Sequence, residues 1–242
     1  IGEKAKIASA QLSQLDNKEK NKVLSDFLKC IKSNKSKILK ANKVDIEKSK
    51  KNKIKDNLID RTMLNEDRIN SICTSIEEVM SFQDPTNKTL SSWKRPNGLI
   101  IQRVTMPIGV IAVIYEARPN VTADVSVLCF KSGNTAILRG GKEAFHTNIV
   151  LSNLFRKCLE KNKINPDCVQ LINSTNRILV DYILSKMANY VDVIIPRGGK
   201  SLVKKVLNLS TVPTIGHLEG LCHIYLDKNF NFNLANKILI NS

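Results

Sequence analysis

The chain has 242 residues, 42% of them hydrophobic, which is enough to bury a substantial core. It contains no run of about 18 apolar residues, and charged residues interrupt the N-terminal stretch IGEKAKIASAQLSQ, where a secretory signal needs an apolar core. These features argue against a membrane protein and predict a soluble cytoplasmic one.

The net charge of +16 leaves three interpretations open: a nucleic-acid partner, an anionic membrane, or a lysine-rich composition without a partner. Residues 1–60 hold sixteen lysines and eight acidic residues, mixed with Asn and Ser along stretches of helical periodicity. Aromatic residues make up 5% of the chain, and none alternates with the basic clusters as a platform for stacked bases requires. A solvated helical face is therefore favoured, and no specific nucleic acid is expected.

The cysteines are scattered singly along the chain, and no C-x-x-C pair indicates zinc or redox chemistry. The three histidines do not have the spacing of metal ligands either. No metal site is predicted, and the thiols are expected to be reduced and mostly buried. The six cysteines are Cys30, Cys73, Cys129, Cys158, Cys168 and Cys222.

Apolar stripes with helical spacing predict that the first ninety residues are helical, up to Asp84 and Pro85. The turn residues RPNG at 95–98 then precede the strand-like LIIQRVT. From there, short β-branched runs alternate with helical segments. The predicted strands are 99–105, 110–115, 135–138, 169–172, 191–195 and 222–226. The predicted helices are 121–132, 143–161, 177–188, 199–208 and 232–241.

This alternation predicts an α/β fold, in which βαβ units form a mainly parallel sheet with helices on both faces. No internal repeat of fixed period is visible. We expect an N-terminal helical region, residues 1–90, to pack on an α/β domain formed by residues 91–242.

Ligands of open α/β sheets bind beyond the carboxyl ends of the strands, so the turns that follow strands are the candidate sites. The first is VIYEARPNVTAD, residues 113–124, where Asn120 is well placed to cap the next helix. Capping alone is a common role for Asn. The functional alternative is that Asn120 or a nearby backbone N–H, together with Arg118, faces a polar or anionic group of a substrate.

Two further turns share the order strand, Arg, Gly, Gly, Lys, helix. Glycines let a backbone approach a ligand closely, and free N–H groups at a helix start attract anions. A plain tight turn explains either alone, but the pair favours a phosphate-rich ligand such as a dinucleotide. The G-x-G-x-x-G and P-loop patterns are absent, so nicotinamide binding would follow another pattern. The residues are Arg139, Gly140, Gly141 and Lys142 in one turn, and Arg197, Gly198 and Gly199 in the other.

Three segments, RVTMPIGVIAVIYEARPNVTADVSVLCFKSGNTAILRGGKEA, DVIIPRGGKSLVKKV and GHLEGLCHIYLD, closely resemble γ-glutamyl phosphate reductase, also called glutamate-5-semialdehyde dehydrogenase. The resemblance implies the aldehyde dehydrogenase fold and NADPH-dependent reduction of L-glutamyl 5-phosphate to glutamate 5-semialdehyde with release of phosphate. It implies that residues 139–142 lie along the adenosine ribose and residues 197–200 near the pyrophosphate. Arg139 and Lys142 would suit the 2′-phosphate of NADPH.

In this family a cysteine attacks the acyl phosphate to form a thioester, which hydride reduces to the aldehyde. The resemblance places that cysteine in a PG-x-CN-like motif beyond the position matching ANKILINS. The 242 residues therefore resemble a fragment, mainly the cofactor domain, with the catalytic domain largely missing. The resemblance implies a homo-oligomer for full-length members and leaves an association with glutamate 5-kinase open.

Cys222 and His223 are neighbours in a predicted strand, where successive side chains point to opposite faces. Core packing is therefore favoured over an activated thiol for Cys222. His217 and Glu219 are assigned no role. Two alternatives stay open: a catalytically inactive remnant that binds nucleotide, and, less favoured, a basic nucleic-acid-binding module.

Overall fold

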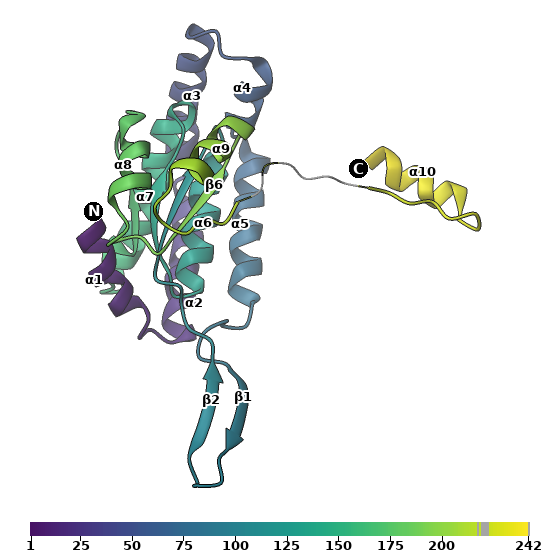
Figure 1. The fold of residues 1–242 in the computed structure, drawn as a ribbon. Helices are drawn as coiled ribbons and strands as arrows, with labels where there is room; N and C mark the ends of the chain where they lie inside the picture. Colours follow the sequence, from purple (N-terminus) through teal and green to yellow (C-terminus); the bar gives the residue numbers. More distant parts are fainter. Residues whose placement is uncertain (217, 219–222, 242) are drawn as a thin grey trace.

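The computed structural model describes residues 1–216, 218 and 223–241. At its centre lies a parallel sheet with the strand order β5-β4-β3-β6 (Figure 1). The strands are β3 (Val110–Tyr115), β4 (Thr135–Arg139), β5 (Val169–Leu171) and β6 (Val193–Arg197). The predicted strands at these four places are confirmed, with β6 beginning two residues later than expected.

The central strand β3 is buried along its whole length, as a continuous apolar run predicts for a strand covered on both faces. Val113 and the residues two positions before and after it belong to one apolar core. Ala112 and the residues two positions before and after it belong to a second core on the other face. The alternation follows from the period of two in a strand. The predicted helix–sheet–helix layering is therefore confirmed.

Helices cover both faces of this sheet (Figure 1). The first face packs against α2 (Asn17–Ser33), α5 (Glu66–Ser81), α6 (Pro119–Lys131) and α7 (Phe145–Lys161), and the second against α8 (Ile178–Lys186) and α9 (Lys200–Leu209). The first ninety residues also form α1 (Gly2–Leu12), α3 (Lys35–Lys51) and α4 (Asp56–Thr62). Two short turns, η1 (Lys142–Ala144) and η2 (Pro166–Cys168), precede α7 and β5.

An antiparallel hairpin projects from the body of the molecule (Figure 1). It consists of β1 (Thr89–Lys94) and β2 (Ile100–Val104), joined by the predicted turn at 95–98. The strand predicted at 99–105 therefore exists, but outside the parallel sheet, and β1 was not predicted. The expected domain boundary after residue 90 falls inside β1, and the division into two domains stays a prediction.

The strand predicted at 222–226 is wrong for its described residues, because 223–226 have no regular structure and are exposed. A strand needs a partner edge, and the β6 edge of the sheet is already met by Thr214, which bridges to Ile194. Cys222 lies outside the described residues. Helix α10 (Phe232–Asn241) has the predicted bounds and lies apart from the sheet in Figure 1. No helix in the described part of the chain could cross a bilayer.

Candidate functional site

The carboxyl ends of three strands meet at one edge of the sheet. In the register, Ile114 of β3 pairs with Arg139 of β4, and Tyr115 pairs with Arg197 of β6. The two Arg-Gly-Gly turns therefore flank the same strand end. A cavity of about 370 Å³, here called the sheet-edge cavity, opens at this place. Its lining includes Glu116, Ala117, Arg139, Gly141, Lys142, Glu143, Thr175, Arg177, Ser201, Leu202 and Lys205.

Glycine is required at the two positions after β4 for different physical reasons. Gly141 lines the cavity, and a Cβ there would lie 3.1 Å from the backbone nitrogen of Ala117. Gly140 lies against the amide of Asn148 and the ring of Tyr115, which a Cβ would meet. Packing inside the protein therefore accounts for Gly140, whereas the close approach of two turns at the cavity accounts for Gly141.

Arg139 and Lys142 differ in what they offer to a ligand. The Arg139 guanidinium donates to the carbonyl oxygens of Gly140 at 2.8 Å and Thr175 at 3.1 Å, and the residue is 8% exposed. It therefore fixes the loop that forms one wall of the cavity. The exposed cations of the cavity are Lys142 and Arg177, and within the described residues neither side chain has a hydrogen-bond or ion-pair partner.

The turn after β6 is hydrogen-bonded through its backbone to the side chain of Glu116. Gly199 is the N-cap of α9, and its N–H donates to the Glu116 carboxylate at 2.9 Å. A Cβ on Gly198 would lie 2.7 Å from the same carboxylate. The side chain of Glu116 therefore sits at the helix N-terminus, where an anion is stabilised by free N–H groups.

The turn between β3 and α6, which contains Glu116, has a strained backbone. Ala117 is buried and has φ 37°, in the left-handed region that a non-glycine residue rarely adopts. Such conformations cluster at functional sites, held by the surrounding structure. The turn between β3 and α6 is therefore fixed between the two glycine turns.

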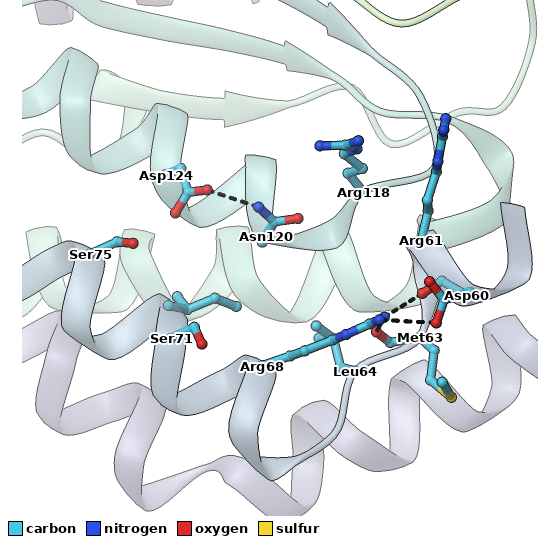
Figure 2. Close-up of a pocket in the computed structure, with 11 residues that line it drawn as sticks. Asp60, Arg61, Met63, Leu64, Arg68, Ser71, Ser75, Arg118, Asn120 and Asp124 are labelled. Carbon is cyan, nitrogen blue, oxygen red and sulfur yellow. Dashed lines mark hydrogen bonds and ion pairs between the residues drawn. The ribbon is translucent and has the colours of Figure 1, made fainter. Parts of the chain in front are cut away.

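A second cavity of about 300 Å³ lies between α5 and the start of α6, and we call it the α5–α6 pocket (Figure 2). Arg118 and Asn120, which the sequence indicated, both line it. The pocket is completed by Asp60, Arg61, Met63, Leu64, Arg68, Ser71, Ile72, Ser75 and Asp124.

The prediction that Asn120 caps the helix is wrong. Arg118 is the N-cap residue of α6, with Pro119 at the first helical position, so Asn120 lies inside the first turn. Its amide nitrogen instead donates to a carboxylate oxygen of Asp124, one turn later, at 3.0 Å. This contact keeps Asn120 and Asp124 together on the face of α6 that lines the pocket.

The three arginines of the α5–α6 pocket have different environments. Arg68 pairs with Asp60 at 2.9 Å. Arg61 and Arg118 are exposed, and in the described part of the chain neither guanidinium has a hydrogen bond or ion pair. Sequence reasoning missed Arg61, because it follows no strand and reaches the pocket from the end of α4.

None of the five described cysteines lines either cavity. Cys129, on α6, is buried, and burial raises the pKa of its thiol to about 12, so it is not an activated nucleophile. The expectation of buried thiols is confirmed for four of these five cysteines, and Cys30 is half-buried. His217, Glu219 and Cys222 lie outside the described residues.

Comparisons with known proteins agree with these features. No protein-family model matches the chain. The γ-glutamyl phosphate reductase of Brucella suis is 41% identical over all 242 residues, and that of Lachnospira eligens is 44% identical. The chain spans about 58% of the length of these two curated relatives.

Solved structures show the same relationship. The crystal structure of γ-glutamyl phosphate reductase from Thermotoga maritima matches 99% of this chain and 58% of its own, with a TM-score of 0.93 and 36% identity. The Saccharomyces cerevisiae enzyme gives a TM-score of 0.83 at 30% identity, over 99% of this chain and 61% of its own. A probable aldehyde dehydrogenase from Listeria monocytogenes, at 14% identity and a TM-score of 0.66 over 89% of this chain and 44% of its own, shows the fold alone. The predicted aldehyde dehydrogenase-like fold is confirmed, and the chain is homologous over its whole length to γ-glutamyl phosphate reductase.

Proposed function

We propose that the chain supplies the dinucleotide site and part of the substrate pocket of a γ-glutamyl phosphate reductase. The reaction is the NADPH-dependent reduction of L-glutamyl 5-phosphate to L-glutamate 5-semialdehyde, with release of phosphate. The turn between β3 and α6 carries the proposal, because Glu116 lines the sheet-edge cavity and Asn120 lines the α5–α6 pocket. One short turn thus separates a candidate cofactor cavity from a candidate substrate pocket.

The residues of the sheet-edge cavity fit a dinucleotide phosphate. The cavity lies beyond the carboxyl ends of parallel strands, where ligands of such sheets bind. Lys142 and Arg177 would hold the phosphate on the adenosine ribose, since both are exposed and unpaired within the described residues. NADPH, when bound, supplies the hydride.

The residues of the α5–α6 pocket would bind and orient the acyl phosphate. The guanidinium of Arg118 offers two parallel N–H donors to a phosphate. Asn120 has two amide hydrogens and uses one toward Asp124, so the other can donate to the acyl oxygen. A donor placed there would stabilise the negative charge that develops on this oxygen when a nucleophile attacks.

Titration calorimetry with NADP⁺ and NAD⁺ tests the cofactor part of the proposal. We expect NADP⁺ to bind more tightly, and the substitution Lys142→Gln to reduce this preference by about tenfold, because one charge-assisted hydrogen bond to the phosphate is lost. Lys40→Gln, on an exposed face of α3, is the matched control and should change neither affinity. Binding of neither dinucleotide by the folded wild-type protein would contradict the proposal.

A turnover assay separates a reductase from the alternative of an inactive remnant. None of the five described cysteines lines either cavity, so none of them is placed to be the thioester-forming cysteine that the family resemblance implies. NADPH oxidation with equimolar phosphate release from L-glutamyl 5-phosphate would support the reductase. Dinucleotide binding without turnover would support the remnant. The homo-oligomer, the kinase association and the cytoplasmic location stay predictions.

A further inference from the structure

Asp124 is a carboxylate that has no cationic partner among the residues that the structure describes. It lies on α6, half-buried, and lines the α5–α6 pocket. Within the described residues, its side chain has one hydrogen-bond partner, the neutral amide of Asn120 at 3.0 Å. Burial raises the pKa of Asp124 above its ordinary value, although the Asn120 hydrogen bond opposes this. A partly buried acid with a single neutral donor would gain from a positively charged partner.

The charges of the pocket are separated in space. Figure 2 shows Asp124 and Ser75 at one end, Arg118 and Arg61 at the other, and Asn120 between them. The side-chain hydroxyl of Ser75, on α5, has no hydrogen-bond partner among the described residues. One end therefore offers an acceptor for a cation together with a free hydroxyl, and the other end offers two guanidinium groups.

L-Glutamyl 5-phosphate has the complementary pattern. Its α-carbon carries an ammonium group beside a carboxylate, and its opposite end carries the doubly charged acyl phosphate. The phosphate is best matched by arginines, which bind it through paired N–H donors. The ammonium group requires an acceptor, and Asp124 is the carboxylate at the far end of the pocket from Arg61 and Arg118.

We propose that Asp124 binds the α-ammonium group of the glutamyl substrate, with Ser75 beside the α-carboxylate and Arg118 and Arg61 on the acyl phosphate. This proposal rests on the proposed function and deepens it. Asp124 would then determine specificity for an amino acid over the corresponding simple dicarboxylic acid, because only the amino compound gives the half-buried carboxylate a cationic partner.

The first test changes the ligand and leaves the protein intact. The probe is the phosphonate analogue of L-glutamyl 5-phosphate, in which a methylene group replaces the bridging oxygen. The comparison compound is the same phosphonate without the amino group. Calorimetric titration of the wild-type chain should show the amino compound binding about tenfold more tightly, the effect of one charge-assisted hydrogen bond.

The second test changes the protein. Asp124→Asn should weaken the amino compound about tenfold and leave the other within about twofold, which removes the preference. Arg118→Gln should weaken both compounds equally, because both carry the phosphonate. Glu78→Gln, an exposed carboxylate elsewhere on α5, is the control and should change neither affinity. Circular dichroism and thermal melting verify that each variant is folded.

The outcomes separate the two proposals. Equal affinities of the wild-type chain for the two compounds, or an undiminished preference in folded Asp124→Asn, would refute the role of Asp124 and leave the reductase assignment standing. If the wild-type chain binds neither phosphonate, the substrate part of the proposed function fails as well. Equal affinities of the wild-type chain for the two compounds would refute the role of Asp124 even if Asp124→Asn does not fold.

Discussion

Glu116 places a negative charge where the proposed cofactor would place its diphosphate. Its carboxylate accepts a hydrogen bond from the N–H of Gly199, and it lines the sheet-edge cavity. A second anion close by would be repelled and would compete with Glu116 for the N–H of Gly199. The side chain of Glu116 must therefore move away, or stay and weaken the binding of a diphosphate.

The substitution Glu116→Gln is expected to tighten NADP⁺ binding by about threefold to tenfold, because the amide keeps an oxygen for Gly199 and removes the negative charge. Titration at low ionic strength measures the effect. Glu160→Gln, an exposed acid at the end of α7, controls for the change in net charge. Weaker binding by Glu116→Gln would show instead that Glu116 contacts the nucleotide directly.

Glycine is required at position 109, directly before β3, both by the backbone conformation and by the neighbouring side chain. Its φ is 123°, and a Cβ would collide with the carboxylate of Asp192. That carboxylate accepts a hydrogen bond from the N–H of Val110 at 2.7 Å and pairs with Lys6 at 2.7 Å. Alanine at position 109 would therefore strain the backbone and displace Asp192.

We expect Gly109→Ala to lower the free energy of unfolding by about 2–4 kcal/mol. The matched control is Gly98→Ala in the hairpin turn, where φ is 89° but no atom lies within 4 Å of the added Cβ. It shows the backbone cost alone, about 1 kcal/mol. Urea unfolding measures both, and equal losses would show that the contact with Asp192 is unimportant.

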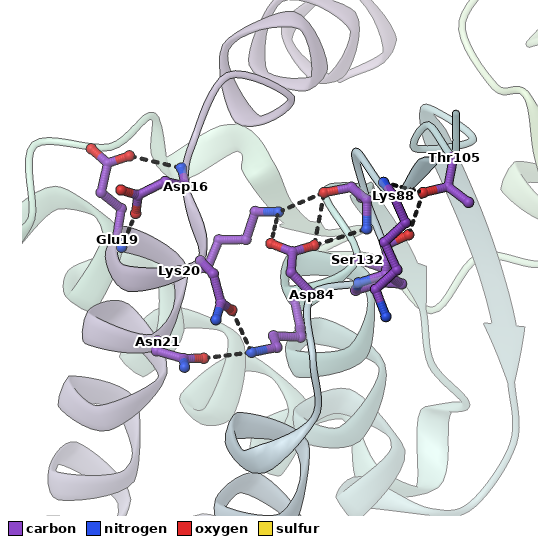
Figure 3. A network of polar contacts seen from close by, with 12 residues as sticks. Asp16, Glu19, Lys20, Asn21, Asp84, Lys88, Thr105 and Ser132 are labelled. Carbon is purple, nitrogen blue, oxygen red and sulfur yellow. Dashed lines mark hydrogen bonds and ion pairs between the residues drawn. The ribbon is translucent and has the colours of Figure 1, made fainter. Parts of the chain in front are cut away.

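The hairpin is attached to the helices by a partly buried polar network (Figure 3). Lys20 of α2 is 1% exposed and donates to Asp84 at 2.8 Å, and Asp84 also accepts from Thr86 at the base of β1. Burial raises the pKa of Asp84, but the hydrogen bonds from Lys20 and Thr86 outweigh it, so the pKa lies below its ordinary value. Lys131, at the end of α6, is close enough to Asp84 and Lys20 to interact with their charges, and it donates to Asn21 at 2.7 Å.

Asp84→Asn should destabilise the protein by about 3 kcal/mol at pH 7, because the buried ammonium of Lys20 loses its counter-charge. The lowered pKa of Asp84 means that its stabilisation is complete above the unfolded-state pKa, about 4, and is lost as pH falls through the folded-state value. The difference between wild type and variant should therefore shrink below about pH 4.

Chemical denaturation at several pH values between 3 and 7 measures this difference. The control is Glu77→Gln, which breaks an exposed pair with Lys32 and should cost less than about 1 kcal/mol. A difference between wild type and Asp84→Asn that stays constant down to pH 3 would show that pairing with Lys20 does not lower the pKa of Asp84 in the folded protein.

The sequence predicted the elements that carry a strong local pattern. Strand β3 reads as an unbroken apolar run, and α10 as a periodic segment, so both have the predicted bounds. Strand β1, with the sequence TLSSWK, is fully exposed and has little apolar character to indicate it. The strand expected at 222–226 has suitable residues, but only the tertiary structure reveals that residues 223–226 have no neighbouring edge.

The candidate site was predictable where it depends on topology and was missed where it depends on packing. Gly141 and Lys142 follow a strand, so the rule for open sheets indicates them. Arg61 lies on α4 and Asp124 on α6, far apart in the sequence, and only the folding of the chain brings them to one pocket. The capping role predicted for Asn120 is wrong for a local reason, because the helix begins at Pro119, two residues before the predicted start, which places Asn120 in its first turn.

The distribution of charge over the whole molecule bears on the remaining alternative, a basic nucleic-acid-binding module. The net charge is +16, but many lysines lie along the exposed faces of α2 and α3, beside acidic residues and without aromatic neighbours. Lys32 of α2 pairs with Glu77 at 3.0 Å, and Lys161 of α7 pairs with Asp26 of α2 at 2.9 Å. Such a surface attracts a polyanion mainly through its long-range field.

We therefore expect binding of a 20-nucleotide DNA that is weak at 50 mM salt and undetectable at 200 mM, because counterion release is its main driving force. Binding of NADP⁺ should change much less over the same range, since its contacts are few and lie in a cavity. Fluorescence anisotropy with labelled DNA, in parallel with the dinucleotide titration, measures both. Lys142→Gln should weaken only NADP⁺, whereas removal of several α3 lysines should weaken only DNA. Micromolar DNA affinity that persists at 200 mM salt would favour the nucleic-acid module over the reductase.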